Sequence, residues 1–194
     1  MQEQYPLEFS LIDEPKLVCR PAGIEDFKKL EKFFLSLPEI DLKVFKDDAL
    51  RDEKMEQWLI DTLKKKFVQL VVLKQNRIIG FATLEDDDHF WENTAEIKII
   101  VAPEYRRKGI GARLFDLLLY EGLENGVQKL LIRYLKDNRG IIKLLENYGF
   151  DSEISLNYNL KDRKNNIHKD LVVSSLNIQD WRRRFEFYRP VPQK

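Results

Sequence analysis

Hydrophobic and polar positions along the chain follow two different periods, and these periods predict the order of its elements. Apolar residues recur every three or four positions from 24 to 37 and from 47 to 66, which is typical of amphipathic helices. The inward positions of the first helix would be Ile24, Phe27, Leu30, Phe34 and Leu37. Runs rich in Val, Ile, Leu and Phe predict strands at 16–20, 67–73, 77–84 and 95–101. Polar residues 74–76 separate two of these runs, so we expect a hairpin there.

The second half of the chain continues the alternation of strand and helix. Strands are predicted at 129–135, 154–160 and 171–176, and helices at 114–123 and 140–147. Glycine follows each helix, at Gly126 and Gly149, where it commonly ends one. This order predicts an α/β (α+β) domain, with a mixed sheet and helices on both of its faces.

The pattern contains no internal repeat, low-complexity tract or linker that would divide the chain. We therefore expect one domain over residues 16–176, followed by a C-terminal helical tail at 177–194. Apolar residues of the tail recur at helical spacing: Ile178, Trp181, Phe185 and Tyr188. We expect this tail to pack on its own domain or across a homodimer.

Composition narrows the classes of function. Lys+Arg and Asp+Glu are equal at 33 each, and this zero net charge argues against a dedicated nucleic-acid binder. Cys19 is the only cysteine and the two histidines lie far apart, so we expect neither a disulfide framework nor a metal site. The acidic run that ends at His89 is interpreted as a solvated turn. Neither a membrane span nor a signal peptide is indicated, so we expect a soluble, cytoplasmic protein with no membrane partner.

The segment that carries candidate chemistry is the basic, glycine-containing stretch between strand 95–101 and helix 114–123. Its residues are Arg106, Arg107, Lys108, Gly109, Ile110, Gly111 and Ala112. A strand that enters a glycine turn and then a helix directs several backbone N–H groups at one point, and the helix dipole also favours an anion there. The two glycines lack a Cβ and allow close approach of a phosphate. A pyrophosphate fits this description, and a solvated basic surface turn is the alternative.

Two familiar phosphate loops are excluded by spacing. A Walker loop needs Lys-Ser or Lys-Thr at its end, whereas Ala112 and Arg113 follow Gly111. A Rossmann fingerprint needs a third small residue where this chain has Leu114. The stretch is therefore not predicted to bind nucleotides in either of these ways.

The stretch resembles the acyl-CoA loop of the GNAT N-acetyltransferase superfamily, whose pattern is Arg or Gln, two residues, Gly, one residue, then Gly or Ala. The likeness continues upstream, in the strand Glu96–Val101 and the following Pro103. It continues downstream in Asn138 and the helix that ends at Gly149. The order of elements from 16 to 176 also matches. The resemblance implies a mostly antiparallel central sheet with a splayed strand pair.

The resemblance also implies an acyltransferase that moves an acetyl group directly from acetyl-CoA, as cosubstrate, to an amine. The backbone of three strand residues would pair with the pantetheine amides: Ile99, Ile100 and Val101. Amides from Arg107 to Ala112 would hold the pyrophosphate. Asn138 matches a side-chain contact near the thioester, and the alternative role for it is the N-cap of the following helix.

Glu96 is the candidate general base. It lies seven residues before Pro103, where several small-molecule members of the family place a glutamate that removes the amine proton. The alternative is a carboxylate on a solvated strand face, paired with a nearby lysine.

Three positions depart from the family pattern. The frequent general acid is a tyrosine seven residues after the asparagine, and that position is Leu145. Tyr134 or Tyr148 could replace it, although Tyr148 occupies a normally apolar position. The ribosomal-protein acetyltransferase branch carries a glutamate base where this chain has Arg133.

These departures bear on the acceptor. We favour a small-molecule amine over a protein amine, and the alternative is a non-catalytic acyl-CoA-binding sensor or interaction module. The acceptor would lie near residues 34–58 and the last hairpin, which includes Tyr158 and His168. Asp47 and Asp48 could attract a cationic amine, but a helix N-terminus is the other interpretation.

Overall fold

The computed structural model describes residues 5–11, 14–45, 60, 68–86, 93–162 and 167–185. The strands are β1 (Leu7–Leu11), β2 (Glu14–Pro21), β3 (Gln69–Lys74), β4 (Arg77–Asp86), β5 (Thr94–Val101), β6 (Lys129–Leu135), β7 (Asp151–Asp162) and β8 (Ile167–Asn177). The helices are α1 (Phe27–Leu35), α2 (Glu39–Phe45), α4 (Ile110–Glu124), α5 (Arg139–Tyr148) and α6 (Ile178–Phe185), with 3₁₀ turns at Ile24–Asp26 and Pro103–Tyr105. None of the helices in these described segments is long and apolar enough to cross a membrane.

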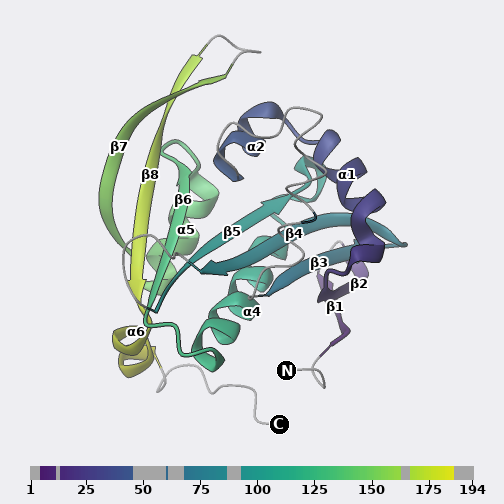
Figure 1. The fold of residues 1–194 in the computed structure, drawn as a ribbon, viewed down its shortest axis with the longest axis horizontal. Helices are drawn as coiled ribbons and strands as arrows, with labels where there is room; N and C mark the ends of the chain where they lie inside the picture. Colours follow the sequence, from purple (N-terminus) through teal and green to yellow (C-terminus); the bar gives the residue numbers. More distant parts are fainter. Residues whose placement is uncertain are drawn as a thin grey trace.

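The described strands form one eight-stranded sheet in the order β1-β2-β3-β4-β5-β6-β8-β7 (Figure 1). β5 and β6 run parallel to each other. Every other neighbouring pair is antiparallel. The predicted mixed, mostly antiparallel sheet is therefore confirmed.

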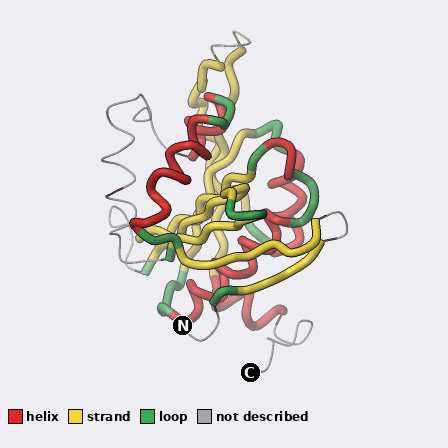
Figure 2. Tube along the Cα trace, turned by 90° about the vertical axis from the view of Figure 1, so that its right-hand side faces the viewer, coloured by secondary structure: helices red, strands yellow, loops and turns green. Residues whose placement is uncertain are grey.

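Helices cover both faces of the sheet, as Figure 2 shows with the strands between two groups of helices. On one face, Leu30, Phe33 and Phe34 of α1 pack with Phe81 of β4 and Ile100 of β5. On the other face, α4 and α5 pack on the alternate residues of the same strands. Successive residues of a strand point to opposite faces of the sheet. A residue of β4 or β5 therefore faces either α1 or the α4–α5 side, according to its position in this alternation.

Local chemistry explains several boundaries that the sequence predicted. Gln75 and Asn76 form the two-residue turn of the β3–β4 hairpin, and both have positive φ values, 48° and 67°, as the favoured hairpin turns require. The Asn138 side chain accepts a hydrogen bond from the Ile141 amide at 3.3 Å and caps α5. Gly149 ends that helix with a φ of 73°.

The structure differs from the predicted elements in three places. β1 and α2 were not predicted, because both are short and a run of five or seven residues carries little periodic signal. β1 is defined by its pairing with β2 instead. Ile24, expected inward, is 64% exposed because it lies in a 3₁₀ turn before α1 and is out of phase with the helix. The helix predicted at 47–66 lies outside the described residues apart from Ile60.

The predicted tail helix is α6, and it packs on its own domain. Ile178 is fully buried, and a Cβ on Gly122 of α4 would lie 3.4 Å from its side chain. Trp181 packs against the same core cluster. Arg182, Arg183 and Arg184 are exposed on the outer side.

Candidate functional site

The central feature of the site is an opening in the sheet between β5 and β6. The two strands pair only from Thr94 with Lys129 to Ile97 with Ile132. Beyond that rung, β5 stays paired with β4 as far as Val101 and β6 stays paired with β8 as far as its end. The strands therefore splay, and the adjacent edges of β5 and β6 are not paired with each other there. The splayed pair implied by the resemblance is present.

The register shows which backbone groups of β5 face this opening. The Ala102 amide donates to the Ile79 carbonyl at 2.9 Å, which makes that pair a hydrogen-bonded one. Hydrogen-bonded and non-bonded pairs alternate in an antiparallel ladder, so the backbone groups of Ile100 point to β4. Those of Ile99 and Val101 point away from β4, into the opening. Of the three residues predicted to pair with pantetheine, these two have suitably directed groups.

The basic glycine loop lies at the wide end of the opening. Arg107 and Gly109 have φ values of 59° and 90°, and this left-handed turn leads directly into α4. Gly109 provides no side-chain cap, so the first N–H groups of α4, including those of Ile110 to Ala112, have no intrahelical acceptor. A Cβ added to Gly111 would meet no atom within 4 Å. This open space beside unpaired amides fits an anionic group such as a pyrophosphate.

The basic side chains of the loop have different surroundings. Arg106 donates from Nε to the Val101 carbonyl at 2.9 Å and from a terminal nitrogen to Asp41 of α2 at 2.6 Å. It therefore ties the loop to the end of β5 and to α2. Lys108 lies over the Tyr105 ring, with 5.4 Å from Nζ to the centroid, and Arg107 is exposed.

The two loop glycines give contrasting predictions. Gly111→Ala should leave stability unchanged or raise it by up to about 1 kcal/mol, because alanine suits a helix better than glycine. The same methyl group enters the open space, so we expect the Kd for acetyl-CoA to rise about tenfold, equivalent to about 1.4 kcal/mol. Gly109→Ala should instead cost about 1–2 kcal/mol of stability through its left-handed backbone. Calorimetric titration and thermal unfolding measure the two quantities.

A matched control exists at the other end of α4. Gly126 has a φ of 73° and, like Gly111, open space around a Cβ. Gly126→Ala should therefore show strain similar to that of Gly109→Ala without changing acetyl-CoA affinity. If Gly111→Ala binds acetyl-CoA with the affinity of the wild type, the loop is not the pyrophosphate-binding site.

Glu96 lies at the closed end of the splay in a network of charged side chains. Arg133 of β6 donates from Nε to Oε1 at 2.5 Å and from a terminal nitrogen to Oε2 at 2.6 Å. Lys98 Nζ lies 3.5 Å from the same Oε2 and 2.9 Å from Glu85, the residue opposite Glu96 on β4. Glu96 is only 8% exposed, so it belongs to a buried network, and its bidentate partner is an arginine.

This network faces the side of the sheet covered by α1 and α2. Ile100 packs against α1, and Glu96 lies four residues earlier on the same strand, so both point to one face. Ile132 packs on the α4 side, and the next residue, Arg133, therefore points to the α1 side. From the sequence, Arg133 was recognised only as a departure from the family pattern, and its contact with Glu96 was not predicted. Alternating polar residues on β4 and β5, at Thr83, Glu85, Glu96 and Lys98, were the available signal.

The candidate general acids do not lie in this network. The Tyr134 hydroxyl lies 3.0 Å from Ser174 Oγ in the core on the α4 side. Tyr148 is buried, packs against Phe115 with ring centroids 4.5 Å apart and the rings tilted by 53°, and donates to Asp116. Leu145 is also buried. Both tyrosines therefore have packing roles.

The residues predicted near the acceptor are only partly described. Phe45 is buried against Phe34 and Phe81, in the core between α1 and the sheet. His168 is exposed on β8. Asp47, Asp48 and the side chain of Tyr158 lie outside what the structure describes.

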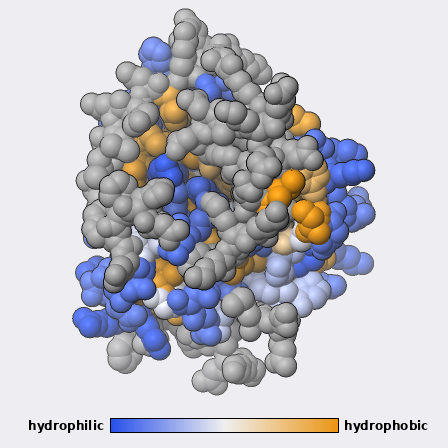
Figure 3. Space-filling model, in the orientation of Figure 1, coloured by the Kyte–Doolittle hydropathy of each residue, from blue (hydrophilic) through white to orange (hydrophobic). Residues whose placement is uncertain are grey.

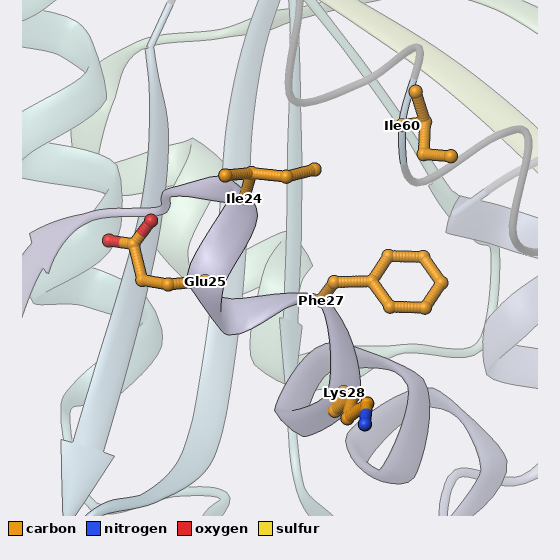
Figure 4. A pocket seen from close by; sticks show the side chains of 5 residues that line it. All are labelled: Ile24, Glu25, Phe27, Lys28 and Ile60. Atoms are coloured by element: carbon orange, nitrogen blue, oxygen red, sulfur yellow. The ribbon is translucent and has the colours of Figure 1, made fainter.

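A separate hollow lies beside the start of α1. It is an open groove of about 360 Å³ lined by Ile24, Glu25, Phe27, Lys28 and Ile60. Figure 4 shows Phe27 and Ile60 facing a common space, while the Glu25 carboxylate points elsewhere. Figure 3 shows hydrophobic surface on the α1 side of the molecule. Among the described residues that line the groove, Figure 4 shows no convergence of polar groups on a common point.

Comparison with known proteins identifies the family. Residues 29–150 match the model of the acetyltransferase (GNAT) family. The chain belongs to the GNAT family. Members of this family use acetyl-CoA, which agrees with the loop and the splay described above.

Relatives within the GNAT family include a [ribosomal protein bS18]-alanine N-acetyltransferase of Haemophilus influenzae. It is 29% identical over 106 residues, which cover 52% of this chain and 70% of that protein. An N-acetyltransferase of Staphylococcus aureus Mu50 has a TM-score of 0.68 at 21% identity, covering 84% of this chain and 98% of its own. A Salmonella typhimurium structure, described as an acetyltransferase with its cofactor acetyl-CoA, has a TM-score of 0.68 at 18% identity. It covers 91% of this chain and 98% of its own. The two solved structures support the GNAT fold.

Proposed function

We propose that this GNAT protein transfers the acetyl group of acetyl-CoA to a primary amine by direct attack, with Glu96 as the general base. The observation that carries the proposal is the position of Glu96: a buried carboxylate, held by Arg133, at the closed end of the splay. The glycine loop lies at the other end of β5. One strand thus connects a site suited to an anion with a side chain suited to accept a proton.

Several groups of this chain would hold acetyl-CoA, which supplies the activated acetyl group. The amides from Arg107 to Ala112 would bind its pyrophosphate, and the backbone of Ile99 and Val101 would pair with its pantetheine arm. The exposed Asn138 follows β6 at the open end of the splay, where its amide N–H₂ group can contact the cofactor while its oxygen caps α5. Backbone N–H groups near Val101 are the donors available to the carbonyl oxygen of the thioester.

Glu96 would accept the proton that an attacking amine loses, directly or through one water. The products would be an N-acetylated amine and free CoA. The departing CoA thiolate takes one proton from solvent, and Glu96 returns the amine proton to solvent. A dedicated general acid is dispensable, because a thiolate with an ordinary pKa of about 8.5 is a tolerable leaving group.

A small-molecule amine is the acceptor that we favour, because Arg133 occupies the position at which the ribosomal-protein branch carries its glutamate base. A protein N-terminal amine is the second candidate, and the Haemophilus influenzae relative favours it. The comparisons give no support to the alternative of a non-catalytic sensor.

Turnover with defined amines tests the proposal. Acetyl-CoA is titrated calorimetrically, and release of free thiol is then followed with small primary amines and with a peptide that begins with alanine. We expect saturable binding, thiol release with at least one amine, and an acetylated product by mass spectrometry. Saturable binding of acetyl-CoA without turnover on any acceptor would contradict the proposed acetyltransferase activity. It would favour a non-catalytic acyl-CoA-binding sensor.

A further inference from the structure

Arg133 and Glu96 form a bidentate ion pair at the closed end of the splay. Both carboxylate oxygens accept from the guanidinium, at 2.5 and 2.6 Å. The Glu96 side chain is 11% exposed and that of Arg133 is 35% exposed. Two parallel charge-assisted bonds fix the plane of a carboxylate as well as its position, which a single bond does not.

The pair also bridges the two strands where they separate. Glu96 lies opposite Leu131, and Ile97 with Ile132 is the last paired rung. Arg133 is the next residue of β6, beyond that rung, and it reaches back across the gap to Glu96. The contact joins residues that are 37 positions apart in the sequence. It therefore links the edge of β5 that would hold the cofactor to β6 at the start of the opening.

We infer that Arg133 is a positioning residue for acetyl transfer, which orients the Glu96 carboxylate toward the reacting amine. This inference rests on the proposed function. A guanidinium has the planar fork needed to bind both oxygens, whereas a lysine ammonium acts as a point charge. Arg133 thus does for the base what a third residue does in other acid–base sites: it restricts the base to the productive orientation.

The geometry further distinguishes the two oxygens of Glu96. Oε2 accepts from Arg133 and has Lys98 Nζ at 3.5 Å. Oε1 accepts only from Arg133 Nε among the described residues. A carboxylate oxygen has two lone pairs, so Oε1 retains an acceptor position. Oε1 is the oxygen that takes the amine proton.

A double-mutant cycle tests the inference, using Arg133→Met, Glu96→Gln and the double variant. Arg133→Met should lower kcat about 10–100-fold, the loss typical of a misplaced catalytic group, while the Kd for acetyl-CoA stays within about twofold. Arg133→Lys should restore part of the loss, because it keeps the charge and one bond. In the Glu96→Gln background, Arg133→Met should change kcat less than about twofold, since the residue acts through Glu96.

Controls separate this role from a structural one. Arg183→Met removes another paired arginine, whose side chain on α6 is 82% exposed, and should leave kcat unchanged. Thermal unfolding of all variants monitors folding. Two results would overturn the positioning role while the proposed function stands. One is a kcat of Arg133→Met within twofold of wild type. The other is a double variant whose fold-loss in kcat equals the product of the fold-losses of the two single variants. Absence of wild-type turnover despite acetyl-CoA binding would overturn the proposed function and the inference together.

Discussion

Glu96→Gln is expected to lower kcat by about 10²–10⁴-fold, the usual contribution of general base catalysis. The glutamine keeps the size of the side chain but cannot accept the amine proton. The glycine loop and the cofactor-facing backbone of Ile99 and Val101 are unchanged, so the Kd for acetyl-CoA should stay within about twofold. Steady-state thiol release and calorimetric titration measure the two quantities.

Glu85→Gln is the matched control for this variant. Glu85 lies opposite Glu96, is similarly buried, and binds Lys98 at 2.9 Å and Thr83 at 3.0 Å. It belongs to the same charged network but lies on β4, further from the opening. Both substitutions should lower the unfolding temperature, whereas only Glu96→Gln should lower kcat strongly. An equal loss of kcat in Glu85→Gln would show that the effect comes from the total charge of the network. It would contradict the role of Glu96 as the general base.

Asp26→Asn is expected to give the largest loss of stability, about 3 kcal/mol at neutral pH, the lower end of the range for breaking a buried ion pair. Asp26 accepts two bonds from Arg20, at 2.6 and 2.8 Å, and a third from the Gly23 amide at 3.1 Å. Its side chain is 1% exposed and that of Arg20 is 28% exposed, so the arginine left behind is partly solvated. The pair joins the end of β2 to the start of α1, on the face that carries Glu96.

The same variant has a predictable pH dependence. Burial tends to raise the pKa of Asp26, but the bonds from Arg20 and the Gly23 amide outweigh it and hold the pKa below its ordinary value. A carboxyl with a lowered folded pKa stabilises the protein above its unfolded pKa of about 3.9, and this contribution disappears as the pH falls through the folded value. The difference between wild type and Asp26→Asn should therefore be full at pH 7 and shrink below about pH 4.

Urea unfolding at several pH values measures this difference. Arg77→Met provides a comparison, because Arg77 forms an ion pair with Glu104 in which both side chains are more than half exposed. Exposed pairs contribute only about 0–1 kcal/mol, so this variant should show a small loss at pH 7. A difference for Asp26→Asn that stays constant from pH 7 to pH 3 would show that its carboxylate charge does not stabilise the fold.

The glycine loop illustrates how far the sequence could predict the site. Its amides, its tight glycine turn and its place before a helix all follow from adjacent residues, and the structure contains each of them. The cap formed by Asn138 was one of two roles foreseen for that residue. The surroundings of Arg106 were not foreseen, because its bond to Asp41 spans 65 positions and depends on α2, which carried no periodic signal.

The sequence by itself determined the order of the strands from β2 to β8 and of helices α1, α4, α5 and α6, together with the turn at Gln75 and Asn76 and the glycine loop. The candidate base was identified through the resemblance to the GNAT family. The elements, the turn and the loop depend on periodicity and turn chemistry within a few consecutive residues. Only the tertiary structure decided that Arg133 binds Glu96, which backbone groups of β5 face the opening, and that Tyr134 and Tyr148 lie in the core. The physical reason is that these contacts depend on the register between strands that are distant in the sequence. β5 and β6, the parallel pair, are separated in the sequence by the whole of α4, so no local pattern records which of their residues lie opposite each other.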